Sequence, residues 1–214
     1  MLEINGMEVP RTLDDLLDPR RVALIVYDMQ VGITRQVSDR ERVLQRVACA
    51  LNSARQAGVR TFFTRHLSLP KQLMGSMQYR TAMAWQHTDD PTRIKSPFLR
   101  DSASFAIEPE LQPRDSEAVF DKITMSAFEG TPLAIALRDC GVRAIVIVGI
   151  AVEIGIEPTA RHAADLGFVP ILVRDACGHG NAEAAARSWQ SLQFCGDAII
   201  SDTERICNAW SNPL

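Results

Sequence analysis

The sequence predicts an α/β fold in which a mostly parallel sheet lies between layers of helices. Short apolar runs alternate along the chain with longer segments of helical pattern, which is typical of βαβ units. Three glycines, Gly58, Gly141 and Gly167, each follow a helical segment and precede an apolar run. Glycine suits the left-handed conformation that ends many helices, because it has no Cβ. Together these observations indicate repeated strand–helix units.

Six strands are expected, and several of them are continuous runs of Val, Ile, Leu and Ala, as in parallel strands covered on both faces. They are residues 22–27, 60–64, 118–120, 144–148, 170–173 and 198–201. Four helices are expected at residues 38–57, 132–140, 153–166 and 182–192. This order predicts a three-layer, Rossmann-like fold with a six-stranded, mostly parallel sheet flanked by helices.

A chain of 214 residues fits one domain of this kind, and the sequence has no repeats or low-complexity tracts. We therefore expect a single domain over residues 1–214, with residues 1–18 as an N-terminal extension. Residues 70–113 form a long insertion between two strands.

The composition is that of an ordinary soluble protein, with 46% hydrophobic and 23% charged residues. A net charge of −3 argues weakly against nucleic acid as a partner. Since no apolar run approaches the ~20 residues that cross a bilayer, and residues 1–18 lack the pattern of a signal peptide, no membrane partner is expected. The cysteines form no CxxC pair, which suits a reducing cytoplasm and gives no zinc or disulfide framework. They are Cys49, Cys140, Cys177, Cys195 and Cys207.

The insertion mixes large apolar side chains with basic ones, and two interpretations stay open. It is longer than a crossover helix requires, so a helix plus a surface loop is the ordinary explanation. Long insertions above a sheet also line binding sites, so a lid or pocket wall is the functional explanation. Its apolar members are Met74, Met77, Met83, Trp85 and Phe98.

Two charged residues follow predicted strands. Asp28 comes directly after residues 22–27, and ligands of open α/β sheets bind beyond these strand ends. Buried there, its carboxyl group could act as a general acid or base, although a helix cap is the ordinary role of such an Asp. Lys122 follows the third strand, where its amine would lie near Asp28 and stabilise negative charge. A solvated surface lysine is the alternative.

The third element is the loop around Gly155, between the fourth strand and a helix. Backbone N–H groups at a helix N-terminus favour negative charge. Gly155 could also be a simple tight residue between strand and helix.

Three segments together resemble the isochorismatase-like (cysteine hydrolase) superfamily. They are Asp28 after its strand, residues 122–131 (KITMSAFEGT) and residues 148–161 (VGIAVEIGIEPTAR), and the resemblance covers roughly residues 20–200. It implies the Rossmann-like fold, hydrolase activity and oligomers, a homodimer or a homotetramer. It places Gly155 where the nucleophilic cysteine is expected. It also implies an oxyanion hole from the N–H groups of Ala151 and Gly155, beside a cis peptide bond between Ile150 and Ala151.

Cysteine members hydrolyse amides through a thiolate, whereas isochorismatases proper carry Gly at this place and cleave a vinyl ether by protonation from the Asp. We therefore expect a hydrolase for a small, anionic molecule, with Asp28 as acid/base, Lys122 as its partner and no covalent cysteine intermediate. Whether the bond is an ether or a C–N bond stays open. The alternatives are a degenerate member that binds a small molecule or partner without turnover, and an engineered Cys→Gly amidase.

The residues expected to contact substrate come from the matched segments and the insertion. Gln30 and Phe128 belong to the first two segments, and Gln78 and Arg80 lie where isochorismatases present polar contacts. The other two are Arg65, which together with Arg80 could hold a substrate carboxylate, and Glu153. Glu153 could orient water for direct hydrolysis or complement the helix dipole.

A substitute thiol and a metal ion are both disfavoured. Cys177 is the nearest candidate thiol, but free cysteines are usually packing residues. Nicotinamidases of the superfamily carry an Asp and His cluster after the second strand, where this chain has only His66. One histidine is not a metal site, so neither a metal nor another cofactor is expected.

Overall fold

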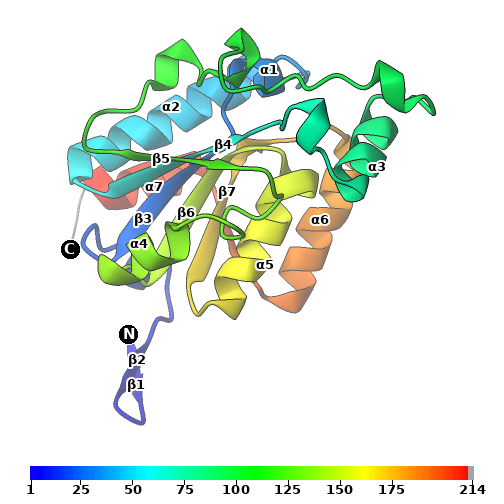
Figure 1. Cartoon of the computed structure of the whole chain (residues 1–214). Helices are drawn as coiled ribbons and strands as arrows, with labels where there is room; N and C mark the ends of the chain where they lie inside the picture. The colour runs from blue at the N-terminus through cyan, green and yellow to red at the C-terminus, as the bar shows by residue number, and fades with distance from the viewer. Residues whose placement is uncertain (212–214) are drawn as a thin grey trace.

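The structure is a computed structural model, and it describes residues 1–211. Six strands form one sheet in the order β5-β4-β3-β6-β7-β8, and every neighbouring pair is parallel. The sheet runs through the centre of the molecule (Figure 1). The strands are β3 (Val22–Tyr27), β4 (Arg60–His66), β5 (Ala118–Lys122), β6 (Ala144–Ile150), β7 (Val169–Gly178) and β8 (Ile199–Ser201). The predicted α/β fold with a six-stranded sheet is confirmed.

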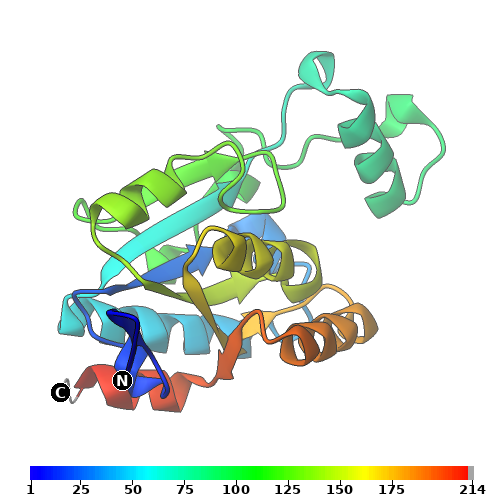
Figure 2. The same ribbon diagram turned by 90° about the horizontal axis from the view of Figure 1, so that it is seen from below.

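Helices cover both faces of the sheet, which gives three layers (Figures 1 and 2). On one face α2 (Arg40–Ala57) and α7 (Thr203–Ser211) pack against a core that includes Leu24 and Val26. On the other face lie α4 (Leu133–Asp139), α5 (Glu157–Asp165) and α6 (Ala182–Cys195), over a second core that includes Ile25 and Tyr27.

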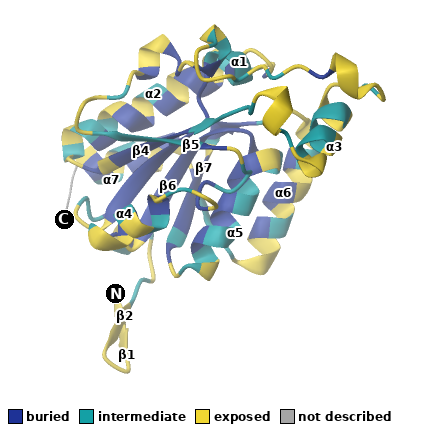
Figure 3. Ribbon diagram, in the orientation of Figure 1, coloured by how far each residue is buried: buried dark blue, intermediate teal, exposed yellow. Residues whose placement is uncertain are grey.

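The central strand β3 explains why both cores exist. All its residues are buried, like the strands at the centre of the sheet in Figure 3. Successive side chains along a strand alternate between the two faces of its sheet. Ala23, Ile25 and Tyr27 therefore face the layer of α4, α5 and α6. This places the Tyr27 ring beneath the segment that leads into α5.

Several elements end later or begin later than predicted. β4 and β5 continue to His66 and Lys122, because their polar ends still pair in register, with His66 opposite Lys122. Helix α5 begins at Glu157 and not at residue 153, because Val152–Ile156 form a π-helical turn. The three predicted helix-ending glycines all have positive φ: Gly58, Gly141 and Gly167.

The N-terminal extension contains a hairpin that sequence analysis missed. Strands β1 (Leu2–Ile4) and β2 (Met7–Val9) pair antiparallel around Asn5-Gly6, both of which have positive φ. An Asn-Gly pair between apolar residues is a strong hairpin signal. The hairpin projects from the body below the sheet (Figure 1).

The insertion is a chain of short helical turns around one longer helix. The short helix α1 (Val31–Thr34) lies between β3 and α2 and is not part of the insertion. The insertion follows β4, and its helices are η2 (Lys71–Leu73), α3 (Ser76–Trp85), η3 (Pro91–Arg93), η4 (Ala103–Phe105) and η5 (Pro109–Leu111). The part around α3 extends away from the body at the carboxyl ends of the strands (Figures 1 and 2). Within residues 1–211, no helix is long and apolar enough to cross a membrane.

Candidate active site

A buried ion pair lies at the carboxyl ends of β3 and β5. Lys122 Nζ donates to Asp28 Oδ2 at 2.7 Å, and the hydroxyl of Thr64 donates to Asp28 Oδ1 at 2.7 Å. The three residues come from neighbouring strands β5, β3 and β4, whose parallel order brings their ends together. The two groups that the sequence places after separate strands are thus direct partners.

Asp28 has an unusual backbone conformation. Its φ is +47°, in the left-handed region that few residues other than glycine adopt. Its N–H is held by the carbonyl oxygen and the hydroxyl of Thr64, both at 3.2 Å. Residues with such backbone strain are enriched at functional sites, where the surrounding structure enforces them.

The ion pair is almost fully removed from solvent, with exposed side-chain fractions of 1% for Lys122 and 5% for Asp28. Such a pair persists only when the remaining polar atoms are also bonded. Lys122 supplies a second hydrogen bond to the carbonyl oxygen of Thr124 at 3.1 Å. Its Nζ also lies 4.4 Å from the centroid of the Tyr27 ring, a cation–π contact.

Tyr27 is a member of this cluster that sequence analysis missed. It is the last residue of an apolar strand run, so its pattern signals only a core position. Its hydroxyl donates to the carbonyl oxygen of Met125. Burial, followed by the charge of Asp28, raises the pKa of Tyr27 well above its ordinary value, so the phenol stays protonated.

The loop after β6 makes a tight turn. The peptide bond between Ile150 and Ala151 is cis. The N–H groups of Gly155 and Ile156 both donate to the carbonyl oxygen of Ala151, at 3.0 and 3.1 Å. The bond from Ile156 spans five residues and closes the π-helical turn. The N–H of Gly155, an oxyanion donor in the resemblance, has the carbonyl oxygen of Ala151 as its acceptor in this structure.

Glu153 lies in the first turn of the π-helical segment, the position that the dipole interpretation expected. Its Oε1 accepts hydrogen bonds from the N–H groups of Gly180 and Asn181, both at 2.7 Å, and so joins the π-helical turn to the start of α6. Its Oε2 is buried and has no hydrogen-bond partner among the described residues.

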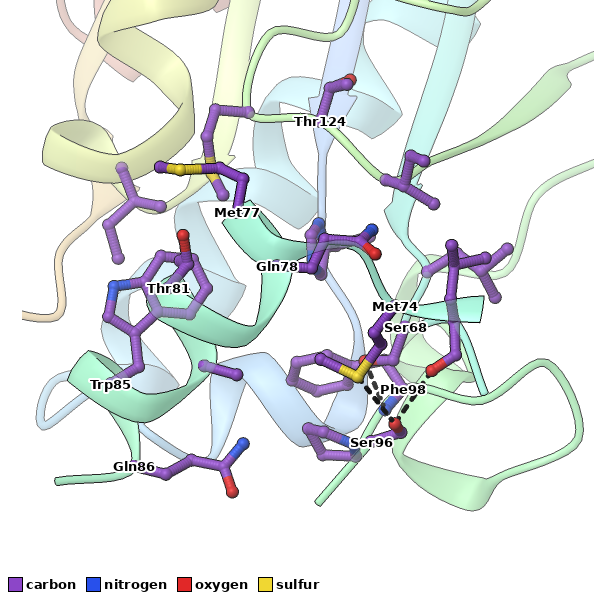
Figure 4. Close-up of a pocket in the computed structure, with 18 of the residues that line it drawn as sticks. Ser68, Met74, Met77, Gln78, Thr81, Trp85, Gln86, Ser96, Phe98 and Thr124 are labelled. Carbon is purple, nitrogen blue, oxygen red and sulfur yellow. Dashed lines mark hydrogen bonds between the residues drawn. The ribbon is translucent and has the colours of Figure 1, made fainter. Parts of the chain in front are cut away.

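A cavity of about 600 Å³ lies between α3 and the strand ends (Figure 4). We call it the α3 cavity. Met77, Gln78, Thr81 and Trp85 of α3 stand along it in Figure 4. Its mostly apolar wall also includes Met74, Phe98, Ile123, Met125 and Ile154, and its polar members include His66, Gln86, Lys95, Thr124 and Glu153. This position supports the interpretation of the insertion as a pocket wall.

The α3 cavity adjoins the ion pair through shared residues. Thr124 and Met125 line it, and their carbonyl oxygens accept from Lys122 and Tyr27. His66 lines it too, opposite Lys122 in the strand register. Burial, more than the nearby charges, lowers the pKa of His66 below its ordinary value.

Of the six residues predicted to contact substrate, Gln78 and Glu153 line the α3 cavity. The other four lie elsewhere. Gln30 is fully buried and bonds the main chain of His66 and Phe105. Phe128 packs in the core against Phe168.

The two arginines are not arranged to hold a carboxylate in the α3 cavity. Arg65 Nε is bonded to Asp121 at 2.7 Å, and its guanidinium lies 4.3 Å from the centroid of the Phe105 ring. Arg80 is exposed on the far side of α3 from the cavity lining. Spacing in the sequence cannot show this, because it depends on which face of α3 turns inward.

Cys177 is a packing residue. It is 7% exposed, and its Sγ contacts the carbonyl oxygen of Ile147 at 3.5 Å. Burial raises the pKa of the Cys177 thiol far above its ordinary value, which disfavours the reactive thiolate. Among residues 1–211, no three His, Cys, Asp or Glu side chains gather as metal ligands.

The fold is a parallel α/β sheet with a buried carboxylate–lysine pair at its strand ends, and the sequence comparison gives its family. Residues 22–204 match the isochorismatase domain, so the chain belongs to the isochorismatase family. It is 30% identical to the isochorismatase family protein YecD of Escherichia coli O157:H7, over 90% of this chain and 98% of that protein. It is 27% identical to the ureidoacrylate amidohydrolase RutB of Acinetobacter baylyi, over 92% of this chain and 86% of the other.

Solved structures show the same fold. A cysteine hydrolase from Pseudomonas syringae superposes with a TM-score of 0.78 at 20% identity, covering 96% of this chain and 99% of that one. The pyrazinamidase of Pyrococcus horikoshii, solved in complex with zinc, gives a TM-score of 0.71 at 22% identity, covering 85% and 99%.

Proposed function

We propose that the protein is a hydrolase for a small molecule, in which Asp28 is the acid/base and no covalent cysteine intermediate forms. The observation that carries this proposal is the buried Asp28–Lys122 pair beside the α3 cavity. The absence of a cysteine intermediate rests on a second observation. The position proposed to match the family's nucleophilic cysteine is Gly155, which has no side chain.

The chemistry follows from the partners of Asp28. In the acid step Asp28 enters as the protonated carboxyl group and delivers its proton to the substrate. The carboxylate that remains is the form seen in the ion pair with Lys122 and in the hydrogen bond from Thr64, and both partners stabilise it. Water then adds to the electron-poor carbon. The carboxylate takes the proton that this water releases, which restores the acid. The adduct then collapses: the C–O or C–N bond breaks, Asp28 gives a proton to the leaving oxygen or nitrogen and takes one from the new hydroxyl group, and one water molecule has been consumed to give two products.

Glu153 is a second carboxylate that we propose to orient this water. It lines the α3 cavity, and its Oε2 has no hydrogen-bond partner among the described residues. Its Oε1 fixes it to the start of α6, so the free oxygen is held in place. Buried polar atoms without partners are rare and call for a ligand or water.

The α3 cavity favours a molecule with an apolar body and an anionic group. Aliphatic residues, methionines, Trp85 and Phe98 form the apolar part of its wall, while Lys95 is its basic side chain besides His66. Lys95, and not Arg65 or Arg80, is therefore proposed to meet a substrate carboxylate. The relative RutB is named as an amidohydrolase, so amides belong beside vinyl ethers among the candidates.

The test is an assay of the purified protein with isochorismate and a panel of small ethers, esters and amides, each with and without a carboxylate. Asp28→Asn should lower kcat/KM by roughly 10²-fold or more, the usual contribution of a general acid/base. Turnover that is unaffected by this substitution would sink the mechanism. If no compound is turned over but some raise the melting temperature, the protein is a binding member of the family.

A further inference from the structure

The backbone at Gly155 does not itself require glycine, because its φ lies outside the left-handed region. The lack of space around Gly155 does require glycine there. A Cβ built on Gly155 would lie 2.0 Å from the hydroxyl oxygen of Tyr27, 2.5 Å from Cζ and 2.6 Å from Cε1. These distances are far below the contact distance of two non-bonded atoms, so no side chain fits at position 155 while Tyr27 stands where it does.

The Tyr27 ring cannot simply swing aside. It is 2% exposed and lies on the central strand β3, packed in the core with Val152 and Ile156. Its hydroxyl donates to the carbonyl oxygen of Met125, and Lys122 Nζ lies over its face. The Tyr27 ring is therefore fixed by the lysine over its face, by its core neighbours and by the hydrogen bond of its hydroxyl group. It cannot move away to make room for a side chain at position 155.

We propose that Tyr27 determines the reaction class of this site, by filling with a phenol the space that a side-chain nucleophile at position 155 would need. The statement about reaction class rests on the proposed function. The steric exclusion of a side chain at position 155 by Tyr27 does not. Because the buried phenol stays protonated, it supplies a neutral hydroxyl and not a nucleophile. Tyr27 and Gly155 then form one unit, and replacing Gly155 alone with cysteine will not recreate a thiol site.

The experiment is a double-mutant cycle with Gly155→Cys, Tyr27→Val and the double variant, measured by thermal unfolding and iodoacetamide labelling. Gly155→Cys alone should lower Tm by roughly 5 °C or more, as overpacking does in a domain of this size. In the double variant valine frees the space, so Tm should rise above that of Gly155→Cys. The introduced thiol, now beside Asp28 and Lys122, should be alkylated.

Gly75→Cys is the matched control, because a Cβ there meets nothing within 4 Å and its φ is −82°. It should leave Tm unchanged. The inference is overturned if Gly155→Cys has the same Tm as Gly75→Cys. It is also overturned if the decrease in Tm of the double variant equals the sum of the decreases in Gly155→Cys and Tyr27→Val. These readouts do not involve turnover, so they separate this inference from the proposed function, which fails or stands with Asp28→Asn.

Discussion

The contact between Asp28 and Lys122 was predictable from the sequence. Each could be placed after a strand from its flanking apolar run, and parallel topology then predicted their proximity, which the structure gives as 2.7 Å. Thr64, which bonds Asp28 at the same distance, could not be found in this way. It lies inside β4, and its role depends on the neighbouring position of β3 and β4 in the sheet. Tyr27 was missed for a similar reason, because its contact with position 155 exists only in the folded packing.

His66 gives a pH dependence whose sign follows from its lowered pKa. The folded state holds the pKa below the ordinary value of 6.5, so the unfolded chain binds more protons in that range. The stability that His66 contributes is complete above pH 6.5 and is lost as pH falls through the folded-state pKa. The urea concentration at the unfolding midpoint should therefore decrease when the pH is lowered from 7.5 to 5.5. The decrease should be smaller in His66→Gln.

The control for this measurement is His87→Asn. His87 is exposed and has a φ of +48°, a conformation that asparagine tolerates. Its substitution should leave the pH dependence as in the wild type. If His66→Gln and His87→Asn show the same loss between the two pH values, His66 is not a source of the effect.

At the scale of elements, the insertion was the part that sequence could only delimit. Its length and its large apolar side chains indicated either a surface loop or a pocket wall. The structure turns Met77 and Trp85 toward the α3 cavity, and leaves Arg80 exposed. The π-helical turn at Val152–Ile156 could not be read from sequence, since its pattern matches the start of an ordinary helix.

The end of α3 is tied to the rest of the insertion by one side chain. Gln86 donates to the carbonyl oxygen of Lys95 and accepts from its N–H, both at 2.9 Å. Gln86→Ala removes both bonds, so trypsin should cut after Arg93 or Lys95 about fivefold faster, the effect of roughly 1 kcal/mol in local opening. Tm should change little, because this segment extends from the body (Figure 2).

Gln72→Ala serves as the comparison for this proteolysis. Gln72 is exposed, and none of the side-chain hydrogen bonds within residues 1–211 involves it. Its cleavage rate should equal that of the wild type. Equal rates for Gln86→Ala and Gln72→Ala would show that Gln86 does not restrain the insertion.

At the scale of the whole molecule, the alternation of apolar runs and helical patterns was enough to predict a parallel sheet with helices on both faces. The terminal helix α7 was missed, although it closes one core with Ile206 and Trp210. Its start signal was present in the sequence: Asp202 directly precedes the helix, and its Oδ1 accepts a hydrogen bond from the N–H of Arg205 at 2.9 Å, as an N-cap does. The substrate is a property of the assembled α3 cavity, so it is not readable from any single segment.

In the proposed mechanism Asp28 moves protons and forms no bond to the substrate. The most direct measurement is a single turnover in H₂¹⁸O of the compound that the panel identifies, with enzyme in excess and mass analysis of product and protein. With Asp28 as acid/base, ¹⁸O should appear in the product and not in the peptide that contains Asp28, and the protein mass should not change at any time. Label in the Asp28 carboxyl group, or a transient protein adduct, would contradict it.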